Sequence, residues 1–85
     1  MQFSGHVKCR NEKFGSVVFD TLSEKVYVTG KTGKDILQAL EDGLDIPSIV
    51  ARLQDTYDGT EEQIRADVTQ FVDGLRSAGL LDSNT

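Results

Sequence analysis

The apolar pattern of this 85-residue chain changes once, near residue 30, and this change limits the folds that the chain can adopt. Before it, short β-branched and aromatic runs alternate with polar turns, which favours half-buried strands. After it, apolar residues recur at the spacing of amphipathic helices. Strands followed by helices in one short chain predict an α+β domain with the helices packed on a single sheet.

Three short strands are predicted in the first part of the chain, at residues 7–10, 17–19 and 26–28. The polar stretch 20–25 has the length and composition of a hairpin loop, and Gly15 indicates a turn before the second strand. Because short hairpin loops join antiparallel neighbours, the strands are expected to form a three-stranded antiparallel sheet.

Three helices are predicted after the breaker cluster at residues 30–33. Gly43 suits the end of the first helix, and Asp45 suits the N-cap of the second. Thr60 and Gln63 have the spacing of a capping box at the start of the third helix. The apolar stripe of that helix comprises Ile64, Val68, Phe71, Val72 and Leu75.

Length and composition predict a single domain over residues 1–85, with a core from about residue 7 to residue 81 and a frayed tail at 82–85. The chain has no apolar run long enough to cross a membrane, and its first residues lack the pattern of a secretory signal. One cysteine, Cys9, cannot form an internal disulfide. These features favour a cytoplasmic protein that acts as a monomer or homodimer.

The charges are divided unequally along the chain. Residues 1–34 carry a net charge of +3, whereas residues 35–85 carry −8. An acidic majority repels phosphate backbones, so the composition argues against nucleic-acid binding. The basic first part could meet an acidic partner, or both faces could simply be solvated.

The side chains that enzymes and metal sites need are not grouped in this sequence. Gly30 and Lys31 suggest a phosphate-binding loop, but Lys25 stands where that motif requires a glycine. His6 and Cys9 have no second pair with which to complete a zinc site. No nucleophile, base and orienting group can be assembled. The sequence therefore predicts no catalysis, no cofactor and no metal.

The last predicted strand is a candidate binding edge. An edge strand presents unpaired N–H and C=O groups, which can add a strand from a partner. If the final helix lies alongside residues 26–28, a groove forms between the strand and the helix. Alternatively, the third helix or a dimer partner covers the edge.

Several segments in order resemble the PqqD family, the precursor-peptide recognition elements of ribosomally made, modified peptides. They are residues 12–17 (EKFGSV), 32–37 (TGKDIL), 40–43 (LEDG), 46–50 (IPSIV), 53–57 (LQDTY), 67–72 (DVTQFV) and 79–81 (GLL). The resemblance implies a winged-helix-like fold of three strands and then three helices. It also implies that the chain binds the leader of a precursor peptide and delivers it to a modifying enzyme, commonly a radical S-adenosylmethionine protein. The pathway would be pyrroloquinoline quinone biosynthesis or another peptide system.

The resemblance places the leader as an added strand on the third strand, against the third helix. The peptide-binding residues that it implies are Lys25, Val26, Tyr27, Val28, Thr29, Ile64, Asp67, Val68 and Phe71. Acidic leader residues could meet Lys25, Lys31 and Arg65. Ile64, Val68 and Phe71 also belong to the apolar stripe, so they could equally be plain core.

Two other classes share the predicted architecture. A winged-helix DNA-binding protein would present the third helix to a phosphate-lined groove, but that helix exposes more acids than bases. A scaffolding or dimerisation module would use the strand edge to pair with another copy. The sequence does not distinguish which peptide or which partner enzyme is involved.

Overall fold

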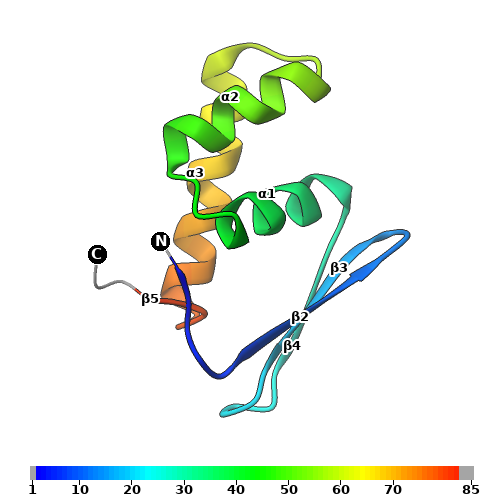
Figure 1. Ribbon diagram of the computed structural model, residues 1–85, viewed down its shortest axis with the longest axis vertical. Coiled ribbons are helices and arrows are strands. Elements are labelled where there is room, and N and C mark those ends of the chain that lie inside the picture. Colours follow the sequence, from blue (N-terminus) through cyan, green and yellow to red (C-terminus); the bar gives the residue numbers. More distant parts are fainter. Residues whose placement is uncertain (1, 83–85) are drawn as a thin grey trace.

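Three antiparallel strands form the predicted sheet (Figure 1). In the computed structural model, which describes residues 2–82, they are β2 (Val7–Glu12), β3 (Gly15–Asp20) and β4 (Val26–Thr29). Their spatial order is β2-β3-β4, so β3 is central, and Val18 lies opposite both Cys9 and Tyr27. Polar loops separate the three strands, as the turn residues predicted.

Three helices follow: α1 (Lys31–Glu41), α2 (Ile46–Thr56) and α3 (Glu61–Ser77). The predicted caps are confirmed. The Asp45 carboxylate accepts from the Ser48 N–H at 3.0 Å, and the Thr60 hydroxyl accepts from the Gln63 N–H at 3.1 Å. Gln63 Oε1 in turn accepts a hydrogen bond from the Thr60 N–H at 3.3 Å, which completes the capping box.

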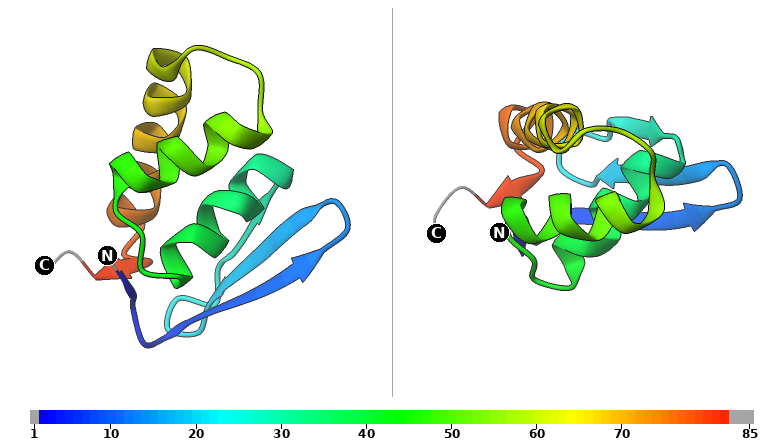
Figure 2. Two further views of the ribbon diagram at one scale, coloured as in Figure 1. Left: turned by 45° about the horizontal axis from the view of Figure 1, so that its top comes forward. Right: turned by 90° about the horizontal axis from the view of Figure 1, so that it is seen from above.

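The core lies between the inner face of the sheet and the helices. Val18 at the centre of β3 is fully buried, and the helices lie on one side of the sheet (Figure 2). The buried apolar residues are Val18, Ile36, Leu37, Ala39, Leu40, Ile49, Val50, Leu53, Ile64, Val68, Val72, Leu75, Leu80 and Leu81. The predicted α+β fold, three antiparallel strands and then three helices, is confirmed.

The structure differs from the sequence prediction at the two ends of the chain. A second, two-stranded antiparallel sheet joins β1 (Gln2–Phe3) to β5 (Leu81–Asp82). Paired backbone therefore begins before residue 7 and includes residue 82, which we expected in a frayed tail; residues 83–85 lie outside the described part. Strands of two residues carry no periodicity, so sequence patterns cannot reveal them.

Asp20 organises the turn that leads into β4. Its carboxylate is buried and accepts from the N–H groups of Leu22 at 2.9 Å and Ser23 at 3.3 Å, while His6 Nε2 lies 3.5 Å away. Desolvation opposes ionisation at this site, but hydrogen bonds from the Ser23 side chain and from these backbone groups outweigh it. The pKa of Asp20 is therefore lowered in the folded state.

We expect Asp20→Ala to lower the Tm at neutral pH, because two N–H groups lose their acceptor. Since folding lowers the pKa of Asp20, its carboxylate stabilises the fold above the ordinary pKa, and this contribution is lost as the pH falls through the folded value. Thermal melts followed by circular dichroism should show the Tm difference shrinking below about pH 4. A difference that stays constant or grows in acid would contradict this account. Asp55→Ala, at an exposed position on α2, is the control and should change the Tm little at neutral pH.

Candidate functional site

β2 and β4 are the two edge strands of the three-stranded sheet, and β4 has β3 as its one hydrogen-bonded neighbour within the described chain. The Asp20 N–H donates to the Lys25 carbonyl at 3.0 Å, which makes these two residues a hydrogen-bonded pair. Because such pairs alternate along an antiparallel ladder, Tyr27 bonds to β3, whereas Val26 and Val28 direct their N–H and C=O groups away from it. The open edge of β4 thus offers two donors and two acceptors to an added strand.

The side chains of β4 also alternate, between the inner and outer faces of the sheet. Tyr27 and Thr29 are half-buried, and Tyr27 packs against the core. Val26 and Val28 are 57% and 65% exposed on the opposite face. A strand added to β4 would share this alternation, because directly opposed residues of a ladder point to the same face.

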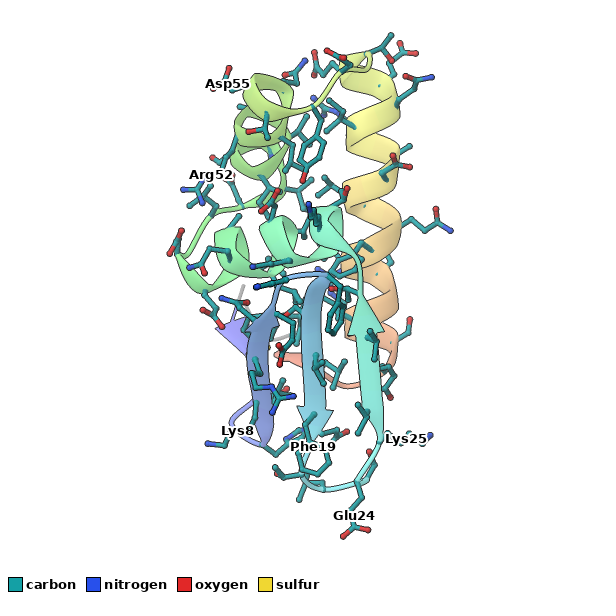
Figure 3. The ribbon with its side chains drawn as sticks, turned by 90° about the vertical axis from the view of Figure 1, so that its right-hand side faces the viewer. Lys8, Phe19, Glu24, Lys25, Arg52 and Asp55 are labelled. Carbon is teal, nitrogen blue, oxygen red and sulfur yellow. The ribbon has the colours of Figure 1, made fainter. Side chains whose placement is uncertain are left out.

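A cavity of about 440 Å³, here called the strand–helix cavity, lies beside the C-terminal end of β4. It is lined by Val28, Thr29, Gly30, Lys31, Thr32, Gly33, Ile36, Asp67 and Phe71. The walls therefore come from the end of β4, from the first two turns of α1 and from the middle of α3, which passes behind the end of β4 in Figure 3. Lys31 and Asp67 bring opposite charges to the lining.

A second cavity, of about 200 Å³, continues from the first along α3. Its lining comprises Thr32, Leu53, Tyr57, Asp58, Ile64 and Asp67, so Thr32 and Asp67 belong to both cavities. The Tyr57 hydroxyl donates to the Asp35 carboxylate. This hydrogen bond, with burial as the lesser cause, raises the pKa of Tyr57 and joins the end of α2 to α1.

Gly33 allows α1 to approach β4 and α3 closely. A Cβ at this position would lie 2.6 Å from Thr29 Cβ and 3.0 Å from Phe71 Cε1. Contacts this short require Thr29 or Phe71 to move. The shape of the strand–helix cavity therefore depends on a residue without a side chain at position 33.

We expect Gly33→Ala to destabilise the chain by about 1–3 kcal/mol, because the clash with Thr29 exceeds the gain in helix propensity. Gly74→Ala is the matched control, since Gly74 lies inside α3 and a Cβ there would meet nothing within 4 Å. That control should stabilise by roughly 0.5–1 kcal/mol. Urea unfolding measures both free energies, and a stabilising Gly33→Ala change would contradict the close approach.

The structure brings some of the predicted site residues together and separates others. Asp67 and Phe71 line the strand–helix cavity, and Ile64 lines the second cavity. Val68 has no exposed surface and lies in the core. Arg65 lies on another surface of α3, with Glu62, Ala66 and Thr69, and pairs with Glu61. Lys25 is exposed immediately before β4.

Sequence reasoning missed the contribution of the first turn of α1. The sequence predicts a breaker at residues 30–33 with the helix after it, whereas the helix already begins at Lys31, with Gly30 as its N-cap. The same residues also form one wall of the strand–helix cavity. Two glycines beside an edge strand were the available signal, because glycine permits close backbone approach.

Neither a metal site nor a reactive thiol is found in the described part of the chain. Within residues 2–82, no three His, Cys, Asp or Glu side chains are grouped so that they could hold a metal ion. Burial, and to a lesser extent Glu41, raises the pKa of the Cys9 thiol, which disfavours the nucleophilic thiolate. Over the same residues, no helix combines the length and apolar content needed to cross a bilayer.

The family described as coenzyme PQQ synthesis protein D (PqqD) matches residues 15–81, which include β3, β4 and all three helices. The chain belongs to the PqqD family. No curated protein matches the sequence of this PqqD-family chain.

Two solved structures share the fold of this PqqD-family chain. TbiB1 in complex with the TbiA(beta) leader peptide superposes with a TM-score of 0.92 at 20% identity, over 100% of this chain and 99% of that one. A lasso peptide synthetase B1 complexed with the leader peptide gives 0.85 at 20% identity, over 93% of each chain. At this identity the likeness establishes the fold.

Proposed function

We propose that this chain binds the leader segment of a ribosomally made precursor peptide and delivers it to a modifying enzyme. The observation that carries the proposal is the open edge of β4, where Val26 and Val28 direct backbone donors and acceptors away from β3. Membership of the PqqD family supports it, and so do the two solved structures of this fold, each of which holds a leader peptide.

The leader adds to β4 as a further strand, with net gains of ~0.5–1.5 kcal/mol for each backbone hydrogen bond. Leader side chains opposite Tyr27 and Thr29 point inward, toward the strand–helix cavity. Apolar ones pack against Phe71, and those that reach the second cavity contact Ile64. Val68 supports this wall from the core.

Charged leader residues meet opposite charges at the two ends of β4. Lys25 precedes the strand and Lys31 follows it, so each can pair with an acidic leader residue at a surface strength below ~1 kcal/mol. Asp67 receives a basic or hydroxyl-bearing residue. Arg65 lies on another surface of α3, where Glu61 already pairs with it, so we do not assign it to the leader.

The chain performs no chemistry itself and acts as a carrier in the cytoplasm. Its partner is a modifying enzyme, for which a radical S-adenosylmethionine protein is our first candidate. The family description suggests the pyrroloquinoline quinone pathway, whereas one of the two solved structures is a lasso peptide synthetase B1. The leader sequence that binds would decide between them.

DNA binding is the poorer reading of the same architecture. On α3, the basic side chains of Arg65 and Arg76 lie within ion-pair distance of Glu61 and Asp73. Glu62 and Asp67 add further negative charge to the same helix. A helix with this balance would be repelled by phosphates in a DNA groove.

We expect Val28→Pro to weaken leader binding at least about tenfold, because it removes an N–H at the open edge and places a ring in the path of the added strand. The β3–β4 ladder should survive, since Val28 does not use its N–H to pair with β3. The measurement is isothermal titration with the N-terminal half of the precursor peptide encoded beside this chain.

Val28→Ala is the matched control, because it shortens the same side chain and keeps the N–H. Its affinity should stay within about threefold of wild type, since Val28 points to the outer face. Equal affinities for the proline and alanine variants, with both folded by circular dichroism, would contradict strand addition. If the wild-type chain forms dimers through β4 and does not bind the peptide, the result would favour the scaffolding alternative.

A further inference from the structure

The outer face of the sheet carries an ordered grid of six exposed or half-exposed side chains. One row across the strands is Lys8, Phe19 and Val26, and the next row is Arg10, Val17 and Val28. The four apolar members occupy β3 and β4, and the two basic members occupy β2. We call these six residues the outer sheet patch.

The outer sheet patch is unusual for a solvated surface. Phe19 is 36% exposed on the central strand, between the more exposed Val26 and the cation of Lys8. The described helices lie on the other side of the sheet (Figures 1 and 2), and Figure 3 views the patch from outside. Adjacent exposed apolar side chains with a charged border are typical of a protein–protein interface.

The patch is continuous with the proposed leader site through Val26 and Val28. These two residues offer their backbone to the leader and their side chains to the outer face. A bound leader strand would extend the outer face by one strand, because its residues opposite Val26 and Val28 must point outward too. Half of the leader's side chains would then lie beside the patch, where this chain alone does not enclose them.

We propose that the outer sheet patch docks the modifying enzyme, through an enzyme surface that is apolar at its centre and carries a carboxylate opposite Lys8; Arg10 already lies 2.6 Å from the Glu12 carboxylate. This inference rests on the proposed leader binding. The inward-facing leader residues select this chain, and the outward-facing ones are presented to the enzyme on the same surface that recruits it. An acidic site on the enzyme fits this patch, because Lys8 adds a positive charge beside the apolar side chains on a chain whose net charge is −5.

A second copy of this chain fits the patch less well. Its acidic part lies in residues 35–85, so complementary charges would pair the sheet of one copy with the helices of another. Such a head-to-tail contact leaves a free sheet and a free helical face on each pair, so it would build larger rings or open chains of molecules. An enzyme with an acidic rim satisfies the same charges in a closed complex.

The test uses the enzyme and precursor leader encoded in the same gene cluster and measures two affinities for each variant. The first is that of the leader for the chain, by isothermal titration. The second is that of the enzyme for the leader-saturated chain, by biolayer interferometry. We expect Phe19→Ser and Lys8→Glu each to raise the Kd for the enzyme about tenfold or more and to leave the Kd for the leader unchanged.

Lys8→Glu is the second variant, in case Phe19→Ser disturbs the fold. Lys8 is exposed on β2, two strands away from the open edge, so its substitution should leave the fold intact. Arg52→Glu makes the same change of charge on α2, away from the patch (Figure 3), and should leave both affinities unchanged. If the enzyme binds both Lys8→Glu and Phe19→Ser as tightly as wild type, the docking proposal is overturned while leader binding stands. The same conclusion follows if the enzyme does not bind the leader-saturated wild-type chain. A Phe19-dependent homodimer in sedimentation overturns it as well. A wild-type chain that binds no leader overturns the proposed function, and this inference with it.

Discussion

The one-sided pairing of β4 is the constraint on which the rest of the structure depends. The backbone of Tyr27 hydrogen-bonds to β3. The backbone groups of Val26 and Val28 point away from β3 and have no partner strand within the described chain. Exposed edges invite aggregation, and proteins limit that risk by keeping them short or flanking them with charge. β4 has four residues and lies between Lys25 and Lys31. The edge is therefore available to one short strand and poorly suited to an extended sheet.

The alternation of β4 divides recognition between two faces. Tyr27 and Thr29 face the helices, and Thr29 lines the strand–helix cavity, which we propose selects the leader side chains. Val26 and Val28 face outward, where the chain has no wall of its own. Backbone hydrogen bonds give affinity that depends little on the sequence of the added strand, whereas pockets for its inward side chains give specificity. A carrier needs this division, because it must bind the peptide and still leave part of it accessible to an enzyme.

The sequence predicted the elements well because local rules determine them. The N-cap at Asp45, the capping box at Thr60 and the apolar stripe of α3 depend only on neighbours along the chain. The site was harder. Arg65 and Asp67 are two residues apart on one helix, yet only Asp67 lines the cavities, because the orientation of α3 is set by its packing against α2. The wall at Thr32 and Gly33 depends on how closely α1 approaches β4, which no local pattern encodes.

The most direct test of the account is a ¹⁵N-HSQC titration of this chain with the leader half of its neighbouring precursor peptide. Strand addition predicts shifts that are concentrated at residues 25–33 and along α3 from residue 64 to residue 71, with slowed exchange of the Val26 and Val28 amides. The amides of Lys8 and Arg10, on the far strand, should move little. Shifts confined to α2, or no shift in a folded protein, would contradict the central claim that the open edge of β4 binds the leader.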